Sequence, residues 1–193
     1  MFKKDFYTVA SPLAFLVGLG WIYLAMVVLK IPGWPAMVGM AGYYAVGGLA
    51  CHERHQNGSQ ALKGLFFGSL ISWIGVALWA SFFKGNPIAM GIVMGAAAAI
   101  FVLATKLKFL GQHHFKAMPQ AFLGATIYFG LFNTFMMAKG VPENLLFGSL
   151  TAFQLPGPIQ PHVSGILALI SGAAGVILGY VHQNVSLRFV AGK

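Results

Sequence analysis

The stretch WPAMVGMAGYYA at residues 34–45 decides the fold, because the sequence contains a similar stretch, MPQAFLGATIYFG, at residues 118–130. Each copy has a proline near its start, a glycine about one helical turn later and an aromatic pair, all within an apolar run. A proline at a helix start loses no internal hydrogen bond, and the glycine lets a second helix backbone approach closely. Allowing one inserted residue, the paired positions are Pro35 with Pro119, Gly39 with Gly124, Tyr43 with Tyr128, and Tyr44 with Phe129. The alternative is a chance likeness between two apolar strings.

The composition places the chain in a lipid bilayer. Hydrophobic residues make up 58% of the 193 positions and charged residues only 8%, whereas charged residues are about 25% of a typical soluble domain. Runs of about 17–25 apolar residues can cross the hydrocarbon core as helices. Six such runs lie near residues 9–29, 35–51, 64–83, 88–105, 120–138 and 163–181. The sequence therefore predicts an all-α, polytopic membrane protein with six transmembrane helices in a single domain over residues 1–193, and its first run is interpreted as a retained helix rather than a signal peptide.

The basic residues predict the orientation of these helices. Nine of the twelve lysines and arginines fall at the termini or in loops on one side, and only Lys30, Lys84 and Lys139 fall on the other. Since basic residues concentrate on the cytoplasmic side, both termini are expected there. The net charge of +9 is then explained by topology and lipid headgroups, without a nucleic-acid partner.

The orientation inverts the second copy of the repeated stretch. The two copies lie in the second and fifth predicted helices, and an offset of three helices means that the first copy runs inward and the second outward. This is the arrangement of a 3+3 inverted repeat, with half-repeats of about residues 9–83 and 88–181 and an outer-face insertion at about 140–162. The insertion is expected to be either an interfacial cap or a re-entrant segment, because its apolar part is too short to span.

Four strings carry a resemblance to a known family: GWPAMVGMAGYYA, LKGLFFGSLISWIGVALW, PQAFLGATIYFG and GVILGYVHQN. Together they resemble the YcdZ-like bacterial inner-membrane proteins, a small family classified under a domain of unknown function, over about residues 30–182. The resemblance implies a location in a bacterial inner membrane and no established activity. The loop CHERHQNGSQALK and residues 140–162 depart from the family's usual pattern.

The predicted spans contain modest polarity and no carboxylate. The acidic residues Asp5, Glu53 and Glu143 all lie outside the spans, which argues against carriers coupled to a buried Asp or Glu. Hydroxyl and amide side chains suit a narrow path for a small neutral solute or a weakly hydrated anion. The alternative is that these groups bond within their own helices and to neighbouring ones. The candidates for lining such a path are Tyr43, Tyr44, Ser69, Ser72, Thr126, Tyr128, Phe129, Asn133 and Thr134.

The histidines suggest a weaker, separate hypothesis. Cys51, His52 and His55 form a C-H-x-x-H pattern, and His113 and His114 lie on a second predicted cytoplasmic loop. Imidazole and thiolate can ligate Zn, Cu or Ni, and histidine can also gate by pH. Solvated histidines at the membrane interface are the simpler interpretation. His182 is expected just after the last helix, on the same side.

The sequence favours transport over catalysis. It has no phosphate-binding loop, nucleophile elbow or zinc-protease motif, so we expect no enzymatic activity and no cofactor. The leading hypothesis is a channel or facilitator for a small neutral or anionic solute, with Tyr44 and Tyr128 at the constriction. The alternatives are an accessory or assembly subunit of a larger membrane complex and, more weakly, a cytoplasmic-face metal or pH sensor. The expected partners are membrane lipid, a small solute, a partner in a membrane complex, and a second copy of the chain, because small residues recur at four-residue spacing.

Overall fold

The computed structural model describes residues 6–29, 32–47, 54–83, 86–104, 118–137 and 159–191. Over these residues the chain is entirely helical, with six α-helices and no β-strand. The prediction of an all-helical chain is confirmed to that extent. The α-helices are α1 (Phe6–Tyr23), α2 (Trp34–Gly47), α3 (Arg54–Phe82), α4 (Pro87–Ala104), α6 (Met118–Met137) and α7 (Gln160–Ala191), and a π-helical turn, η1 (Leu24–Val28), follows α1.

Two helices are longer than the sequence predicted. Helix α3 begins at Arg54, so residues 54–63 of the expected loop CHERHQNGSQALK are helical. Helix α7 continues to Ala191, so His182 lies within the helix rather than after it. Both predictions were wrong for one reason: they ended each helix where the apolar run ended. Residues such as Gln, Arg and Leu have good intrinsic helix propensity and extend a helix beyond its apolar part.

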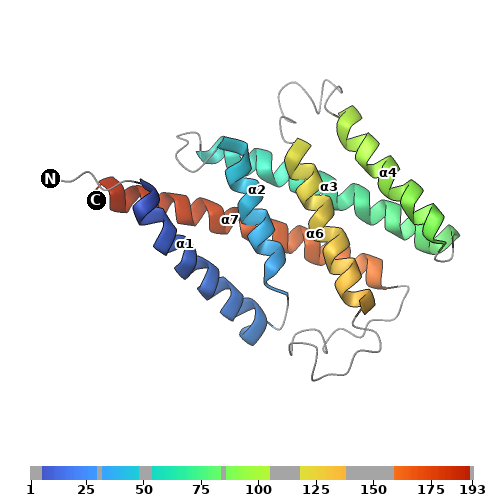
Figure 1. Ribbon diagram of the computed structural model, residues 1–193, viewed down its shortest axis with the longest axis horizontal. Coiled ribbons are helices and arrows are strands. Elements are labelled where there is room, and N and C mark those ends of the chain that lie inside the picture. The colour runs from blue at the N-terminus through green and yellow to red at the C-terminus, as the bar shows by residue number, and fades with distance from the viewer. Residues whose placement is uncertain are drawn as a thin grey trace.

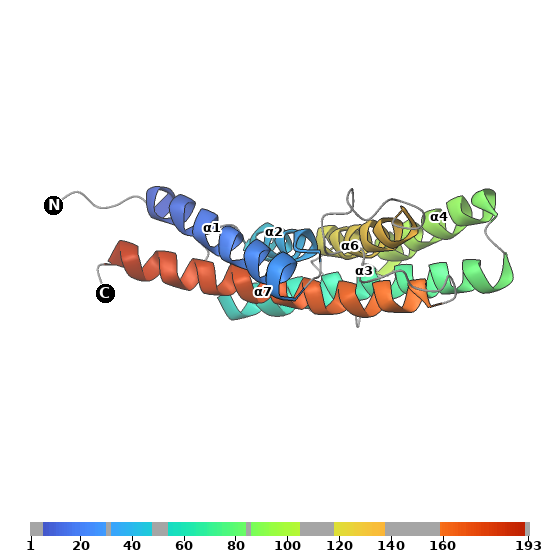
Figure 2. The same ribbon diagram turned by 90° about the horizontal axis from the view of Figure 1, so that it is seen from below.

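The helices form two layers. Figure 2 shows α3 and α7 lying together in one layer, with α1, α2, α6 and α4 packed across them in the other. In Figure 1, α1, α3 and α6 run toward the lower right, and α2, α4 and α7 run back toward the upper left. Each helix therefore runs opposite to the helix before it in the chain.

Helix α2 crosses α7 at glycines on both helices. A Cβ atom added to Gly39 would lie 2.6 Å from the carbonyl oxygen of Gly172, and one added to Gly175 would lie 2.1 Å from that of Ala36. Real Cβ atoms do not approach oxygen so closely, so these two backbones touch directly. Only glycine fits at Gly39 and Gly175 without moving a helix.

Helix α6 crosses α3 in the same way. A Cβ atom on Gly124 would lie 2.1 Å from the carbonyl oxygen of Leu65, and one on Gly68 would lie 1.8 Å from that of Ala121. The residue spacing matches that of the first crossing: three positions separate Ala121 from Gly124, and three separate Leu65 from Gly68. The two crossings thus use the same pattern of contacts on two different pairs of helices.

The turn into α4 is held by side chains as well as by the backbone. The Asn86 side-chain oxygen accepts a hydrogen bond from the backbone N–H of Ile88 at 2.9 Å, and the backbone carbonyl of Asn86 accepts one from the indole N–H of Trp79 at 2.7 Å. Asparagine is a favoured helix N-cap, and Pro87 then occupies the first helical position. These contacts fold α4 back along α3.

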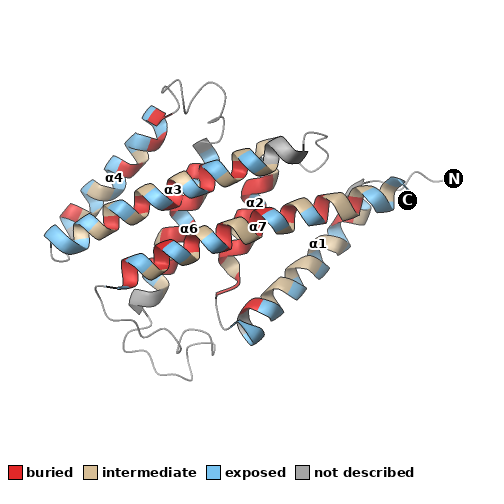
Figure 3. Cartoon of the chain, turned by 180° about the vertical axis from the view of Figure 1, so that it is seen from behind, coloured by how far each residue is buried: buried red, intermediate tan, exposed pale blue. Residues whose placement is uncertain are grey.

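The outer surface is apolar. Large hydrophobic side chains are widely exposed, among them Phe15 at 68%, Phe82 at 73% and Ile88 at 75%. Figure 3 shows exposed residues along the outward sides of the helices and buried ones where the two layers meet. Two helical segments, Gly58–Phe82 and Gln160–Ala191, are long and apolar enough to cross a membrane, and Thr8–Tyr23 and Ile88–Ala104 are shorter apolar helices.

Candidate functional site

One face of α7 is buried from Gln160 to Ser186 and carries most of the buried polar side chains among the described residues. Alanines and glycines occupy much of this face, so other helices come close to it. Polar side chains interrupt the small residues at both ends. We call this surface the polar face of α7; its buried polar residues are Gln160, Ser164, Ser171, His182, Gln183 and Ser186.

The first of two polar groupings on this face joins α2 to α7. The Tyr43 hydroxyl donates a hydrogen bond of 2.5 Å to the side-chain oxygen of Gln183, and both side chains are completely buried. A Cβ atom on Gly179 would lie 2.7 Å from the Tyr43 ring. Glycine at this position is therefore what lets the tyrosine ring lie flat against α7.

The same grouping holds α1 in place through a histidine. His182 is 2% exposed, and its Nε2 atom lies 2.8 Å from the carbonyl oxygen of Ala10 in α1. A carbonyl can only accept, so Nε2 carries a proton and donates it to Ala10. The Tyr44 hydroxyl contacts Nδ1 of the same ring and also lies 3.2 Å from the carbonyl oxygen of Gly179. His182 thus joins three helices. We call Tyr43, Tyr44, His182 and Gln183 the histidine cluster.

Sequence reasoning missed the two α7 members of this cluster. His182 and Gln183 follow the apolar run and were placed outside the last helix. The signal that could have found them is spacing: Gly172, Gly175 and Gly179 recur every three or four residues, and residues 182 and 183 continue that face.

The second grouping lies where α3, α6 and α7 meet. The Tyr128 hydroxyl of α6 is fully buried and donates a long hydrogen bond of 3.4 Å to the carbonyl oxygen of Pro161. The Ser69 hydroxyl of α3 donates to the carbonyl oxygen of Gly124 at 2.9 Å. Ser72 and Ser164 are completely buried, and their hydroxyl oxygens have no hydrogen-bond partner among the described residues. We call Ser72, Tyr128 and Ser164 the serine cluster.

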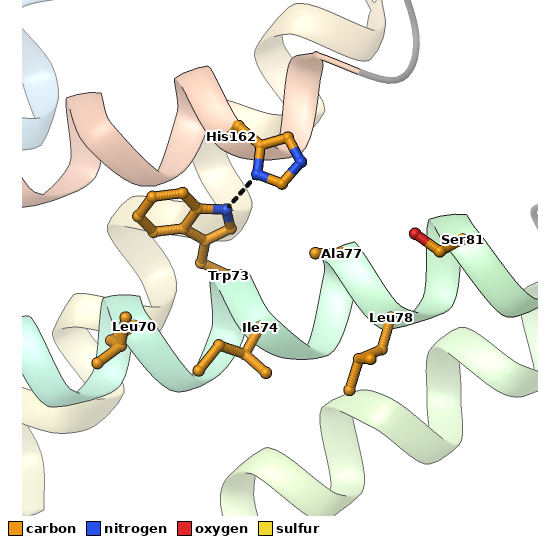
Figure 4. Close-up of a pocket in the computed structure, with 7 residues that line it drawn as sticks. All are labelled: Leu70, Trp73, Ile74, Ala77, Leu78, Ser81 and His162. Atoms are coloured by element: carbon orange, nitrogen blue, oxygen red, sulfur yellow. Dashed lines mark hydrogen bonds between the residues drawn. The ribbon is translucent and has the colours of Figure 1, made fainter.

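A tryptophan covers the outer edge of this second grouping. The Trp73 indole N–H donates to Nδ1 of His162 at 3.1 Å, as Figure 4 shows. A Cβ atom on Gly165 would lie 2.2 Å from the Trp73 ring, so the indole lies directly on the α7 backbone. The tryptophan and the histidine also line an outward-facing hollow of about 360 Å³ along α3, whose other lining residues are Leu70, Ile74, Ala77, Leu78 and Ser81.

The remaining pore candidates are exposed, bond to their own helix or pack against apolar residues. Thr126 is exposed and donates to its own helix at the carbonyl of Phe122, 2.9 Å away. Thr134 does the same to Gly130 at 2.7 Å, and Asn133 is exposed. Phe129 is partly buried against the core. Polar side chains of five of the nine candidates are thus buried or partly buried at the interface between the layers: Tyr43, Tyr44, Ser69, Ser72 and Tyr128.

Thr126 and Phe129 instead line a groove between α4 and α6. Its volume is about 410 Å³, and its other walls are alanines and large apolar residues such as Met94, Phe101 and Phe122. Because the threonine hydroxyl already bonds to its own helix, this groove offers little to a polar solute.

The two prolines of the repeated stretch each occupy the second residue of a helix. Pro35 follows Trp34 at the start of α2 and is buried, whereas Pro119 follows Met118 at the start of α6 and is exposed.

The proposed metal ligands fall outside the described structure. Cys51, His52, His113 and His114 are not among the described residues, and of His55 only the helical backbone is. In the part of the chain that the structure does describe, no group of three or more His, Cys, Asp or Glu side chains could hold a metal ion.

Fold and site together define a class: a small all-helical protein with two candidate membrane-spanning helices, an apolar outside and a buried polar interface between two layers. The chain belongs to the family described as "Protein of unknown function (DUF1097)", whose profile matches residues 13–186. That match contains the residues 30–182 that carry the family resemblance noted in the sequence. The name YcdZ-like itself stays a prediction. No curated protein matches the chain, and no solved structure matches it.

Proposed function

We propose that this protein is a membrane facilitator for a small neutral or anionic solute, with its pathway between the two helical layers. The observation that supports it is the polar face of α7, which carries serine, glutamine and histidine side chains from one end of the helix to the other, buried against α2, α3 and α6. Buried polar side chains are expensive in a lipid-facing protein, and those that occur commonly mark solute or ion pathways.

The proposal includes six spans in a bacterial inner membrane with both termini cytoplasmic. It draws support from the alternating helix directions in Figure 1 and from the apolar outer surface, which lipid would cover. Helix α7 is about 48 Å long at 1.5 Å per residue, so it exceeds the roughly 30 Å hydrocarbon core. Its polar C-terminal turns would then reach the cytoplasmic interface.

The proposal also includes an inverted repeat of α1–α3 against α4–α7. The repeat pairs α1 with α4, α2 with α6 and α3 with α7. Under this pairing the contact of Gly39 with Gly172 corresponds to the contact of Gly124 with Leu65. The second contact of each crossing lies three residues away on both helices, at Ala36 with Gly175 and at Ala121 with Gly68. The paired helices run in opposite directions in Figure 1. In proteins of this architecture the substrate site lies near the midplane between the halves.

The conformation described here is closed on this hypothesis. Backbones touch at Gly39 with Gly172 and at Gly68 with Ala121, and Tyr43 and Tyr128 are fully buried. Passage would require the layers to separate beside one crossing at a time. Such movement is typical of a facilitator that rocks between two states rather than of a permanently open pore.

The test is stopped-flow light scattering on proteoliposomes of purified, folded protein, challenged with urea, glycerol and, separately, monovalent anions. We expect faster equilibration than in protein-free liposomes for at least one of these solutes. The Tyr44→Phe and Tyr128→Phe variants, which keep the rings and remove the hydroxyls, should alter that rate. Equal rates with and without protein across the whole panel would reject the proposal.

A second candidate is an assembly subunit of a larger membrane complex, and one observation favours it. Added Cβ atoms on Gly91 and Gly95 of α4 would meet nothing within 4 Å, although such spacing is typical of helix–helix contacts. This surface would bind a partner helix or a second copy. A partner that co-purifies from mild detergent and is lost in Gly91→Leu would support this candidate.

The sensor hypothesis on His52, His55, His113 and His114 stays a prediction, and neither candidate involves catalysis or a cofactor.

A further inference from the structure

Two serine hydroxyls in the core lack what buried polar groups normally have. Ser72 and Ser164 are 0% exposed, and neither hydroxyl oxygen has a hydrogen-bond partner among the described residues. Most buried polar side-chain atoms in folded proteins are hydrogen-bonded, and each exception calls for an explanation. Two exceptions on neighbouring helices point to a common cause.

A contact between α3 and α7 places the two serines relative to each other. Trp73 and Gly165, the residues directly after Ser72 and Ser164, are in contact across α3 and α7. The two serines therefore lie on facing turns of the two helices.

The hydroxyl of Tyr128 joins them from α6. It bonds to the carbonyl of Pro161 at 3.4 Å, one helical turn before Ser164. The bond from Ser69 to Gly124 joins α3 to α6 one turn before Ser72 and one turn before Tyr128. Since α3 and α7 run in opposite directions (Figure 1), the two contacts hold α6 against them on either side of the turns that carry the serines.

We propose that the serine cluster is the binding site for the transported solute, and that this solute is a small neutral molecule carrying both hydrogen-bond donors and acceptors, of the urea or polyol type. This inference rests on the proposed function and narrows its solute class. Three hydroxyls can each donate and accept, while the carbonyl of Pro161 can only accept and would repel an anion. Within the described residues the buried side chains with polar atoms are serines, glutamines, a histidine and the tyrosines Tyr43 and Tyr128, with no carboxylate or ammonium group among them.

Trp73 and His162 close this site toward the lipid side. The indole lies on Gly165 and bonds to His162 (Figure 4), so the route to the serines leads between the layers and not through the outward-facing hollow along α3. The exposed Ser81, which lines that hollow, is consequently not part of the site.

The experiment compares wild type with the Ser72→Ala/Ser164→Ala double variant, using urea and glycerol as neutral probes and nitrate as the anionic one. Ser69→Ala is the matched control, because it removes a buried α3 hydroxyl that already has a protein partner. The first readout is solute flux in proteoliposomes. We expect the double variant to lose about tenfold in urea or glycerol flux, the effect of two hydrogen bonds of ordinary strength, and Ser69→Ala to keep the wild-type preference among probes.

The second readout is thermal unfolding of the detergent-solubilised protein with and without each probe, because a bound solute raises the melting temperature of the protein that binds it. We expect urea or glycerol to raise the melting temperature of wild type relative to the double variant, and nitrate to have no such differential effect. The double variant itself should melt no lower than wild type, since it loses no protein hydrogen bond.

The two readouts separate the site from the function. If wild type transports urea or glycerol and the double variant transports it equally fast, the serine cluster is not the binding site, but the protein is still a facilitator. If wild type transports none of the probes, yet urea or glycerol raises its melting temperature relative to the double variant, the protein has a neutral-solute site and is not a transporter. A differential shift with nitrate alone, or no differential shift with any probe, would overturn the inference.

Discussion

At the scale of single residues, four glycines decide how close the layers come. Gly39, Gly68, Gly124 and Gly175 each face a backbone carbonyl oxygen within 2.6 Å of where a Cβ atom would sit. A methyl group there has no flexible neighbour to displace, so a whole helix must move. Gly20 has the same chemistry and open space around it, which makes it the natural control.

We therefore expect Gly124→Ala to lower the free energy of unfolding by about 1–3 kcal/mol, the usual cost of overpacking a core. Gly20→Ala should leave it unchanged or raise it slightly, because alanine favours helix more than glycine does. Thermal unfolding followed by tryptophan fluorescence measures both. Equal melting temperatures for Gly124→Ala and wild type would show that α6 does not touch α3 at this glycine.

The two central tyrosines give a second prediction. Tyr43 makes a 2.5 Å hydrogen bond to a buried amide, whereas Tyr128 makes one of 3.4 Å, which is at the limit of a useful bond. Tyr43→Phe should cost about 1–2 kcal/mol of stability, since it removes a hydrogen bond between two fully buried side chains. Tyr128→Phe should cost clearly less, and the same unfolding assay compares the two. A larger loss for Tyr128→Phe would contradict the hydrogen-bond geometry described here.

Residue identities were the part of the site that sequence could supply. The repeated stretch indicated Gly39, Gly124, Tyr43 and Tyr128, and all four lie where the layers meet. Sequence could not say which hydroxyls face inward, because one residue of rotation on a helix turns a side chain by about 100°. The sequence therefore could not show that the side chains of Thr126 and Asn133 face outward.

At the scale of elements, polar contacts hold α1 near both of its ends. His182 of α7 donates to the Ala10 carbonyl, the Trp21 indole N–H donates to the Gly33 carbonyl at 2.8 Å, and much of the rest of α1 is exposed apolar surface. The helix lengths explain why sequence missed the His182 contact: α7 continues past its apolar part, and His182 lies in that continuation. An apolar-run criterion detects the part of a helix that lipid surrounds and not the part beyond it.

His182→Phe should loosen α1 without unfolding the rest of the protein. We expect amide hydrogen exchange in Phe6–Tyr23 to accelerate about five- to tenfold, the effect of one lost hydrogen bond on local opening. Exchange in α3 should not change. The control is Asn184→Ala, two residues on, whose side-chain amide donates to the Tyr180 carbonyl of its own helix at 2.8 Å. Unchanged exchange in α1 would mean that the histidine does not hold it.

At the scale of the whole molecule, the helix directions make a topological prediction. Six spans with alternating direction place both termini on one side, as the basic residues also indicate. Green fluorescent protein fused to either terminus should fluoresce in bacteria. Alkaline phosphatase fused after Lys30 or Lys84 should be active, and the same enzyme fused after His52 or His113 should be inactive. An active fusion after His52 would refute the six-span topology.

The two ends of the interface between the layers are braced unequally. The histidine cluster holds its end with the Tyr43–Gln183 bond and a Tyr44–His182–Ala10 chain, whereas beside the serine cluster the layers are joined by the Ser69–Gly124 bond and by the long bond from Tyr128 to Pro161. In a rocking facilitator the weakly braced end separates at lower free energy. In the proposed topology this end faces the periplasm, so the protein would open outward more readily than inward, and it would admit a solute from outside at a lower energetic cost than one from the cytoplasm.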